Sequence, residues 1–295
     1  MIVIINKSGQ LANRLFLMAN FIAFSNAHEI KIYNPSFDEY AKFFEKTSPQ
    51  ALVRFPISTN SKWRMPYTDI IRSMVYQVIY KAVRVLEKLN IYESTIHCIL
   101  DIGLYQKMPL DSAKFINLAR KKKFLLCKGW AFRDETNFSL AADIIKPYFK
   151  PLPCYLTQAI TIANSARSSE NTLLVGVHIR RGDYKTFLNG KYFFPLSVYI
   201  SYINKVQSLF PGRDIKFIVC SNETIDVRVF KGYDVVLEER NMVVDLALLA
   251  ACDYIIGPPS TFSIWASYYG DVPLYKIENE QEQVITLDKF TIHGK

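Results

Sequence analysis

The residues best suited to chemistry follow an apolar run and include two adjacent arginines. Residues 176–184 read Gly-Val-His-Ile-Arg-Arg-Gly-Asp-Tyr, directly after the apolar residues 173–175. In an open α/β sheet, ligands bind outside the carboxyl ends of the strands. An arginine guanidinium pairs with phosphate oxygens through two hydrogen bonds. His178 and Arg180 lie two apart and therefore share one face of a strand. The pattern points to a phosphate-bearing ligand, and hence to a nucleotide or nucleotide-sugar enzyme.

A second segment offers phosphate ligands of another kind. Its sequence predicts a helix over 244–251, a strand over 253–256, a rigid Gly-Pro-Pro turn and a helix that begins near Ser260. Serine and threonine are natural N-caps, and a helix N-terminus presents free N–H groups and the positive end of its dipole. Either this is an ordinary capped helix or, beside the arginines, it forms half of a pyrophosphate site.

Together with an N-terminal block, these segments resemble the α-1,2-fucosyltransferases of glycosyltransferase family 11, which are GDP-fucose-dependent. Residues 178–184 are similar to the family's His-x-Arg-Arg-x-Asp signature, and residues 245–263 to its Asp-Leu…Ser-Thr-Phe-Ser block. Residues 9–14, Gly-Gln-Leu-Ala-Asn-Arg, resemble its Gly-x-Leu-(Gly/Ala)-Asn-(Gln/Arg) turn. The blocks occur in the family's order, whereas residues 35–130 carry no recognisable signature of it.

The chain departs from the family pattern at two places. Residues 220–223 are Cys-Ser-Asn-Glu where the family usually has Ser-Asp-Asp after a strand. Residues 260–267 are Ser-Thr-Phe-Ser-Ile-Trp-Ala-Ser where the family usually has Ser-Thr-Phe-Ser-Trp-Trp-Gly-Ala. These departures affect the expected identity of the acceptor and of the linkage more than the expected identity of the donor.

The expected fold class is α/β, because predicted strands alternate with helices. The strand-like runs are 2–5, 30–33, 124–127, 173–178, 215–220, 234–237 and 253–256. The resemblance implies a GT-B fold, in which two Rossmann-like halves face a cleft. We expect an N-terminal acceptor-side domain over 1–153 and a C-terminal GDP-sugar-binding domain over 154–295. The resemblance further implies an inverting enzyme that moves L-fucose from GDP-β-L-fucose, with the 2-hydroxyl of a galactoside as the expected acceptor.

Two residues of the arginine block are the candidates for catalysis. Arg180 would stabilise the negative charge that builds on the leaving β-phosphate, and the resemblance gives this arginine the same role. Asp183 is either the general base for the acceptor hydroxyl or a residue that orients the arginines. Arg181 either assists Arg180 or pairs with an acidic residue that holds the loop.

The remaining candidates would bind the donor. Asp245 either recognises guanine, as the resemblance supports, or caps the helix that it begins, and His178 belongs to the base or β-phosphate side of the same pocket. Backbone N–H and hydroxyl groups of 260–263 would bind the phosphates. From the facing domain, Asn13 and Arg14 would meet the sugar and the acceptor beside Gly9. The candidates for the phosphates are thus Ser260, Thr261, Phe262 and Ser263, and the candidates of the N-terminal block are Gly9, Asn13 and Arg14.

Cysteine and histidine usage predicts no metal site and no disulfide framework. The five cysteines are widely spaced without a Cys-x-x-Cys pair, and the four histidines lie far apart in sequence. No Asp-x-Asp motif appears, and the expected protein donors suffice for the pyrophosphate, so no metal cofactor is expected. GDP-fucose enters as a co-substrate.

Charge and hydropathy bear on partners and location. No apolar run is long enough to cross a bilayer, and residues 1–5 are expected to form the first strand rather than a signal peptide. The resemblance implies that an animal relative would carry a membrane anchor before this point, so we expect a bacterial cytoplasmic enzyme; the resemblance further suggests a role in the assembly of surface glycans such as lipopolysaccharide or O-antigen. Net charge is +9. Residues 1–150 hold 22 Lys and Arg against 12 Asp and Glu, a balance of +10.

The basic half suggests an anionic partner. Residues 68–89 predict an amphipathic helix, which either faces the core of its domain or leans on anionic lipid at the inner face of the membrane. No nucleic-acid-binding signature is present. Two other functions compete: a glycosyltransferase that uses another nucleotide sugar, and a non-enzymatic basic adaptor for membrane or nucleic acid.

Overall fold

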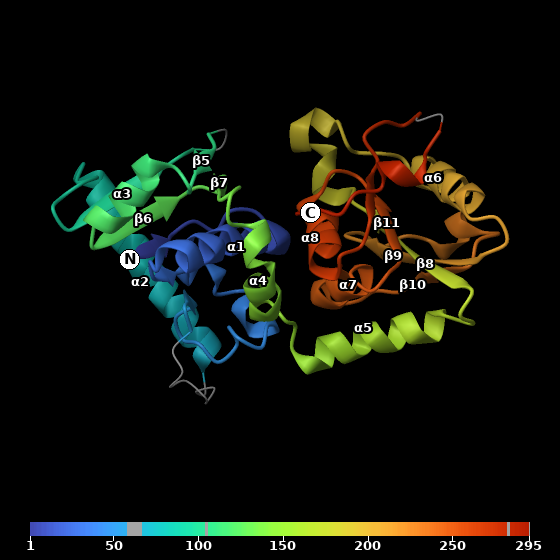
Figure 1. Ribbon diagram of the computed structural model, residues 1–295, viewed down its shortest axis with the longest axis horizontal. Coiled ribbons are helices and arrows are strands. Elements are labelled where there is room, and N and C mark those ends of the chain that lie inside the picture. Colours follow the sequence, from blue (N-terminus) through green and yellow to red (C-terminus); the bar gives the residue numbers. More distant parts are fainter. Residues whose placement is uncertain (58–66, 104–105, 282–283, 295) are drawn as a thin grey trace. The chain divides into compact units, whose positions relative to one another are not determined.

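The protein folds into two compact units, Met1–Leu152 and Pro153–Lys295. A computed structural model describes residues 1–57, 67–103, 106–281 and 284–294 (Figure 1). Each unit contains its own largely parallel sheet with helices packed around it (Figure 1). None of the helices within these ranges is long and apolar enough to span a bilayer.

The first unit is built on a sheet with the strand order β3-β2-β1-β6-β4. All of its strands run parallel except β3, which pairs antiparallel to β2. A separate short ladder joins β5 and β7. The strands are Ile2–Ile4 (β1), Ile32–Tyr33 (β2), Arg54–Phe55 (β3), His97–Asp101 (β4), Met108–Pro109 (β5), Phe124–Lys128 (β6) and Phe132–Arg133 (β7), and the helices are Leu11–His28 (α1), Thr68–Lys88 (α2), Ala113–Lys121 (α3) and Ala142–Tyr148 (α4).

Helix α1 occupies the centre of the first unit. Its residues from Leu11 to Ser25 are buried with hardly an exception, which suits a helix that is apolar on almost every face. The helix begins directly after a turn in which Gly9 has a φ of +66°. It ends at Glu29, a left-handed residue whose N–H donates to the carbonyl of Ser25.

The second unit is built on a parallel sheet with the order β10-β9-β8-β11-β12. Numbered within the unit, this is the 3-2-1-4-5 order of a Rossmann sheet. The central strand β8 is buried along its whole length. The strands are Thr172–Ile179 (β8), Asp214–Ser221 (β9), Val235–Leu237 (β10), Tyr254–Gly257 (β11) and Leu274–Lys276 (β12), and the helices are Pro153–Ala166 (α5), Leu196–Leu209 (α6), Met242–Leu249 (α7) and Thr261–Gly270 (α8).

Short 3₁₀ turns punctuate both units. In the second unit η4 follows β8 almost immediately, so its residues lie at the carboxyl edge of the sheet. These turns are Pro35–Phe37 (η1), Ala41–Phe43 (η2), Ser139–Ala141 (η3), Gly182–Lys185 (η4), Phe187–Gly190 (η5), Val227–Phe230 (η6) and Leu287–Lys289 (η7).

Every predicted strand segment coincides with an observed strand, and the α/β class is confirmed. The short or edge strands β3, β4, β5, β7 and β12 were not predicted from the sequence. Each has only two to five residues, too few for an alternation pattern to stand out.

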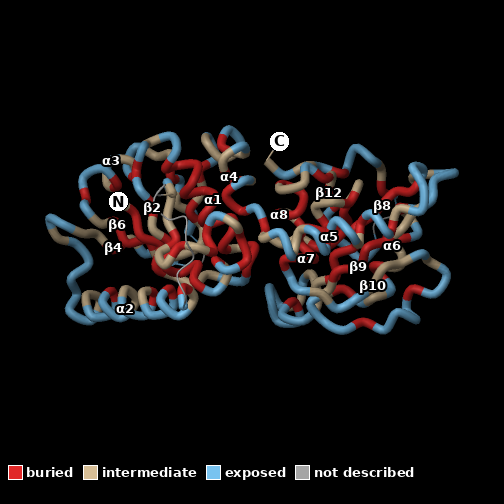
Figure 2. Tube along the Cα trace, turned by 90° about the horizontal axis from the view of Figure 1, so that it is seen from below, coloured by how far each residue is buried: buried red, intermediate tan, exposed pale blue. Residues whose placement is uncertain are grey.

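Helix α2 has the predicted extent, but only part of its apolar stripe faces the core. Ile70, Met74 and Val78 are 57%, 62% and 67% exposed. The helix instead buries Thr68, Arg72, Tyr76 and Val83. Figure 2 shows exposed residues along the length of α2. Of the two alternatives for this helix, the core-facing one therefore holds for only part of the apolar stripe: Val83 is in the core, and Ile79 and Leu86 pack against it. Periodicity defines a stripe without saying how much of it is covered.

Candidate functional site

The sequence blocks of the second unit meet where the strand order reverses. β8 lies between β9 and β11, and the chain leaves β8 toward β9 on one side and reaches β11 on the other by a later crossover. This reversal is the position at which open α/β sheets bind ligands, outside the carboxyl ends of the strands. β8 ends at Ile179 and β11 at Gly257, so residues 180–184 and 258–263 flank the reversal.

Gly257 allows the two strand ends to approach closely. A Cβ atom at this position would lie 2.8 Å from the carbonyl oxygen of His178 and 3.0 Å from its Cβ. The first of these distances is shorter than real Cβ contacts, and the obstacle is backbone that cannot move aside. Glycine is thus required for the arginine loop and the Gly-Pro-Pro turn to lie side by side.

Arg180 is mostly buried and is held by its own loop. Its Nη2 donates to the Asp183 carboxylate at 2.8 Å, and its guanidinium lies 5.7 Å from the centre of the Tyr184 ring. The Arg180 side chain is 13% exposed, whereas that of Asp183 is 51% exposed. The guanidinium is therefore fixed in direction, and the carboxylate beside it remains open to solvent.

Arg181 is tied to the loop that follows β9. Its Nε lies 3.1 Å from a carboxylate oxygen of Glu223, and its backbone N–H donates to the side chain of Asn222. Its guanidinium also lies over the ring of Phe193. Of the two roles expected for Arg181, this arrangement corresponds to pairing with an acidic residue that holds the loop.

Helix α8 begins as its sequence predicts. Ser260 is the N-cap, in an extended conformation, and its hydroxyl accepts from the N–H of Phe262 at 3.3 Å. Ser263 is fully buried and donates to the carbonyl of Ser260, whereas Thr261 is half-buried. The Tyr184 hydroxyl donates to the carbonyl of Pro259 at 2.7 Å, which joins the turn to the arginine loop.

His178 is a buried imidazole with unused hydrogen-bonding capacity. It is 3% exposed, and within the described residues its Nδ1 has no hydrogen-bond partner. Its ring packs against that of Phe262, with centroids 5.1 Å apart. Burial, and secondarily the Arg180 charge, lowers the pKa of His178 from 6.5 to about 3. The ring is thus neutral at pH 7 and able to accept or donate one hydrogen bond to a ligand.

Asp245 lies at the same edge of the sheet, paired with an arginine. Arg240 Nε donates to Asp245 Oδ1 at 2.7 Å, and its Nη2 donates to the carbonyl of Val219 at 2.8 Å. Cys220, which contacts Arg240 through its sulfur, is the register partner of His178 in β9. Burial raises the pKa of Asp245, while Arg240 acts in the opposite direction.

Asp245 does not cap its helix. The N-cap of α7 is Asn241, whose side chain accepts from the N–H of Val243 at 2.9 Å. Asp245 falls in the first helical turn, because α7 begins at Met242 rather than at the predicted 244. The capping alternative is therefore wrong, and the carboxylate is held at the sheet edge by Arg240 instead.

The N-terminal candidates gather at the turn after β1. Gly9 adjoins Asn13, and a Cβ on Gly9 would collide with the Asn13 side chain. Arg14 is 7% exposed; its guanidinium donates to the carbonyls of Gly9 and Ser36. It also lies 3.2 Å from Glu39. Arg14 thus braces the Gly9 turn within the first unit.

Several residues near the carboxyl edges of the two sheets were not identified from the sequence. Arg240 and Tyr184 each join two loops of the second unit. In the first unit, Lys7 pairs with Asp38 and Glu39 near the Gly9 turn. No sequence signal could have found the last group, because its members are about 30 residues apart and become neighbours only through the crossover from β1 to β2.

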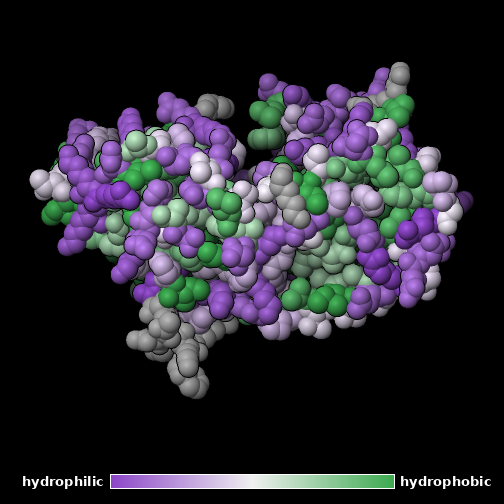
Figure 3. Space-filling model, in the orientation of Figure 1, coloured by the Kyte–Doolittle hydropathy of each residue, from purple (hydrophilic) through white to green (hydrophobic). Residues whose placement is uncertain are grey.

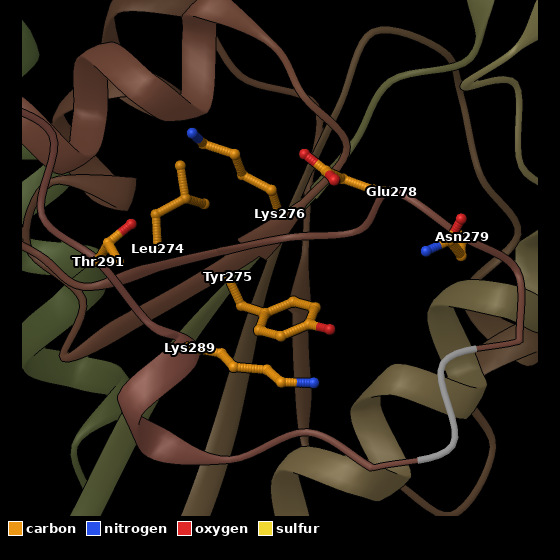
Figure 4. A pocket seen from close by; sticks show the side chains of 7 residues that line it. All are labelled: Leu274, Tyr275, Lys276, Glu278, Asn279, Lys289 and Thr291. Carbon is orange, nitrogen blue, oxygen red and sulfur yellow. The ribbon is translucent and has the colours of Figure 1, made fainter.

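An open pocket lies elsewhere on the second unit, beside the outer strand β12 (Figure 4). It is lined by Leu274, Tyr275, Lys276, Glu278, Asn279, Lys289 and Thr291. This lining includes none of the predicted site residues. The predicted site is defined by the converging loops at the strand ends and not by this pocket.

The sequence of the second unit matches a known family. The model of glycosyl transferase family 11 matches residues 156–280. The matched region extends from α5 to just beyond β12, and it contains the arginine loop, Asp245 and the N-terminus of α8. No curated protein sequence matches the chain significantly.

Solved structures similar to the whole chain are fucosyltransferases. A variant of Arabidopsis thaliana FUT1 in complex with GDP has a TM-score of 0.55 at 14% identity, covering 95% of this chain and 71% of that one. The fucosyltransferase NodZ from Bradyrhizobium has a TM-score of 0.55 at 15% identity, covering 97% of both chains. At such identities the likeness establishes the fold. The GT-B type, with two Rossmann-like halves, is confirmed.

Metal ligands do not cluster in the part of the chain that the structure describes. No three His, Cys, Asp or Glu side chains among those residues are grouped closely enough to hold an ion. The charges that could neutralise a bound phosphate at the edge of the second unit's sheet are those of arginine side chains and of the α8 N-terminus.

Proposed function

We propose that this protein belongs to glycosyltransferase family 11 and is an inverting fucosyltransferase that moves L-fucose from GDP-β-L-fucose to the 2-hydroxyl of a galactoside. The observation that carries the proposal is the convergence of Arg180 and the N-terminus of α8 on the strand-order reversal of a Rossmann sheet. The donor is inferred from the sequence resemblance. Supporting it, FUT1 and NodZ share the fold, and NodZ was solved after soaking with GDP-fucose.

The pyrophosphate would lie between the arginine loop and the α8 turn. Arg180 would pair with the β-phosphate through its planar fork. The N–H groups at the start of α8, with the hydroxyls of Ser260 and Thr261, would donate to the remaining phosphate oxygens. Phe262 and Ser263 shape this turn, the first by packing on His178 and the second by its bond to Ser260. Such donors make a divalent ion unnecessary, so we propose that catalysis is metal-independent.

The guanine base would be recognised by Asp245 and His178. A carboxylate can accept from the ring N–H and the exocyclic amine of guanine together, an arrangement that adenine does not offer. Arg240 holds the Asp245 carboxylate by one oxygen and so fixes its direction. The unpaired Nδ1 of His178 is a second polar atom that suits a bound nucleotide.

In the reaction, the acceptor oxygen would form a bond to C1 of fucose as the bond from C1 to the β-phosphate oxygen breaks. The bonding electrons pass to the phosphate, and the GDP that leaves carries the additional negative charge. Arg180 would stabilise that charge more in the transition state than in the ground state. Attack on the face opposite GDP converts the β-linked donor into an α-fucoside.

The acceptor proton needs a receiving group. Asp183 is half-exposed and therefore reachable by solvent or acceptor. Its ion pair with Arg180 suits an orienting role equally well, because the same contact fixes the guanidinium. We propose orientation as its main contribution, since an oxocarbenium-like C1 reacts with a weak nucleophile, and the acceptor proton would then pass to solvent water. The role of general base is the alternative.

The first unit would supply the acceptor side. The Gly9 turn, with Asn13 and the brace provided by Arg14, lies at the carboxyl edge of its own sheet. We propose that residues 1–153 bind the acceptor glycan and 154–295 the donor. We further propose that the reaction takes place in the bacterial cytoplasm, where nucleotide sugars feed the assembly of surface glycans such as O-antigen.

The test is incubation of the full chain with GDP-fucose and a panel of small galactosides. Product masses would report transfer of one deoxyhexose, and linkage analysis with anomeric NMR would report the position and the configuration. We expect an α-linked fucose on O2 of galactose. A product on another hydroxyl would change only the proposed acceptor position and would leave the proposed donor as it stands. Transfer from GDP-mannose or a uridine-diphosphate sugar, but not from GDP-fucose, would overturn the donor.

A further inference from the structure

Helix α2 carries an apolar face that the described structure leaves uncovered. Tyr67, Ile70, Met74, Val78 and Val85 are each more than half exposed. At 100° per residue Ile70, Met74, Val78 and Val85 fall within one narrow stripe of the helix surface, and Tyr67 is the residue directly before the helix. Exposed apolar side chains that are scattered singly are normal on a protein surface, whereas a row of large ones marks an interaction surface.

Residues on the opposite, buried face of α2 fix the orientation of the helix. Arg72 is 2% exposed, and its Nη1 lies 3.0–3.1 Å from the carbonyls of Thr47, Ser48 and Gln50, to which it donates. Tyr76 and Val83 are also buried on this side. A helix anchored by a buried guanidinium cannot rotate to bury its other face. The exposed stripe is therefore a stable property of the first unit.

Basic residues continue the exposed face toward the C-terminus of the helix. Lys81, Arg84 and Lys88 are exposed; at 100° per residue Lys81 and Lys88 fall within the stripe, and Arg84 lies at its edge. Around them, residues 1–150 carry 22 basic and 12 acidic side chains, a balance of +10. Hydrophilic residues cover much of the first unit in the view of Figure 3, with smaller apolar areas between them. An exposed apolar face that also carries exposed lysine and arginine side chains suits a helix that lies at an anionic lipid surface.

The segment after α2 also exposes apolar and cationic side chains. Leu89, Ile91, Tyr92 and Ile96 are 40–62% exposed. Ile96 accepts a hydrogen bond from the N–H of Phe124, which brings it next to the basic run 120–123. Lys122 of that run is buried against Glu93, whereas Lys121 and Lys123 are exposed. Apolar and cationic groups thus alternate beyond the end of the helix.

We propose that the exposed face of α2 is a docking surface for anionic phospholipid bilayers. Its apolar side chains would enter the headgroup boundary while Lys81, Arg84 and Lys88 remain at the level of the anionic headgroups. The charge of the first unit favours this occupant over a second copy of the chain, because pairing two units that each carry +10 opposes association. The inference is independent of the donor that the second unit binds.

The test is sedimentation of the full chain with vesicles. One set would be phosphatidylcholine alone, and the other would contain about one-third phosphatidylglycerol. We compare the wild type with Met74→Ser/Val78→Ser and with Lys81→Gln/Lys88→Gln. The matched controls are Leu140→Ser, which alters an exposed apolar residue elsewhere, and Lys31→Gln/Lys46→Gln, which removes two exposed lysines of the same unit.

We expect binding to the anionic vesicles only, reduced roughly tenfold by either α2 variant and changed less than about twofold by the controls. Melting temperatures and activity on soluble substrates should be unchanged, because the altered side chains are exposed and distant in sequence from the proposed site. Equal binding by the α2 variants, or no binding by the wild type, would overturn the proposal. So would a dimer that Met74→Ser/Val78→Ser dissociates, since a second copy would then be the occupant.

Discussion

Replacing Arg180 by lysine separates the geometry of this side chain from its charge. In the structure the guanidinium is 13% exposed and donates to Asp183 at 2.8 Å. A lysine keeps one positive charge but offers a single ammonium, which cannot both retain that contact and pair with two oxygens of the β-phosphate. Loss of a key donor to a developing anion costs about 3–4 kcal/mol of transition-state stabilisation, or roughly 10²–10³ in kcat.

The expected effect on stability is far smaller. The ion pair with Asp183 involves a carboxylate that is 51% exposed. Exposed or partly exposed pairs contribute about 0–1 kcal/mol, so the melting temperature should change little. A large loss of kcat with a nearly constant melting temperature would therefore identify a role in the reaction rather than in folding.

The assay is steady-state transfer with saturating GDP-fucose, together with thermal unfolding of each variant. Arg228→Lys is the matched control, because Arg228 is an 87% exposed arginine of the same unit that also pairs with a nearby aspartate. Arg180→Ala should be at least as impaired as Arg180→Lys. A folded Arg180→Lys enzyme that keeps more than about a tenth of the wild-type kcat would refute the reasoning.

Three further outcomes are expected. Asp245→Ala should weaken GDP binding while ADP and UDP remain poor ligands; wild-type affinities for the three nucleotides within about threefold of one another, measured by calorimetry, would contradict the guanine assignment. Activity should persist in EDTA after dialysis against it; loss that Mg²⁺ or Mn²⁺ restores would refute metal independence. The pKa of His178 is lowered from 6.5 to about 3, so the unfolded chain takes up a proton below pH 6.5 that the folded chain does not. The free energy of unfolding should therefore decrease as the pH is lowered from 6.5 toward 3, by up to about 1.4 kcal/mol per pH unit. Denaturant unfolding of His178→Gln at the same pH values should lack this decrease.

The second unit was largely predictable because its signals are local. The run from Leu173 to Val177 contains no polar side chain, as a strand buried on both faces requires. Ser260 after two prolines marks a helix start, and the structure begins α8 at Thr261. A strand end with Arg180 and a capped helix are sequence-local features, and the Rossmann order of the sheet brings them together.

Other features depend on contacts that sequence does not display. The stripe of α2 was recognised, but its burial was decided by Arg72, whose guanidinium finds three backbone carbonyls of a distant loop. The partnership of Arg240 with Asp245 spans a loop and the start of a helix, and an arginine at that spacing carries no particular signal. The three-residue strand β12 is recognisable only through its pairing with β11.

The central claim is that a guanosine diphosphate group lies between the ends of β8 and β11. Amide hydrogen exchange with and without GDP tests this directly, with ADP as the comparison nucleotide. We predict that GDP slows exchange in residues 180–186 and 260–264 and that ADP does so much less, because the N–H groups at the start of α8 would donate to phosphate and Asp245 would reject adenine. GDP that binds but leaves both segments unchanged, or protects instead the pocket beside β12, would contradict the account.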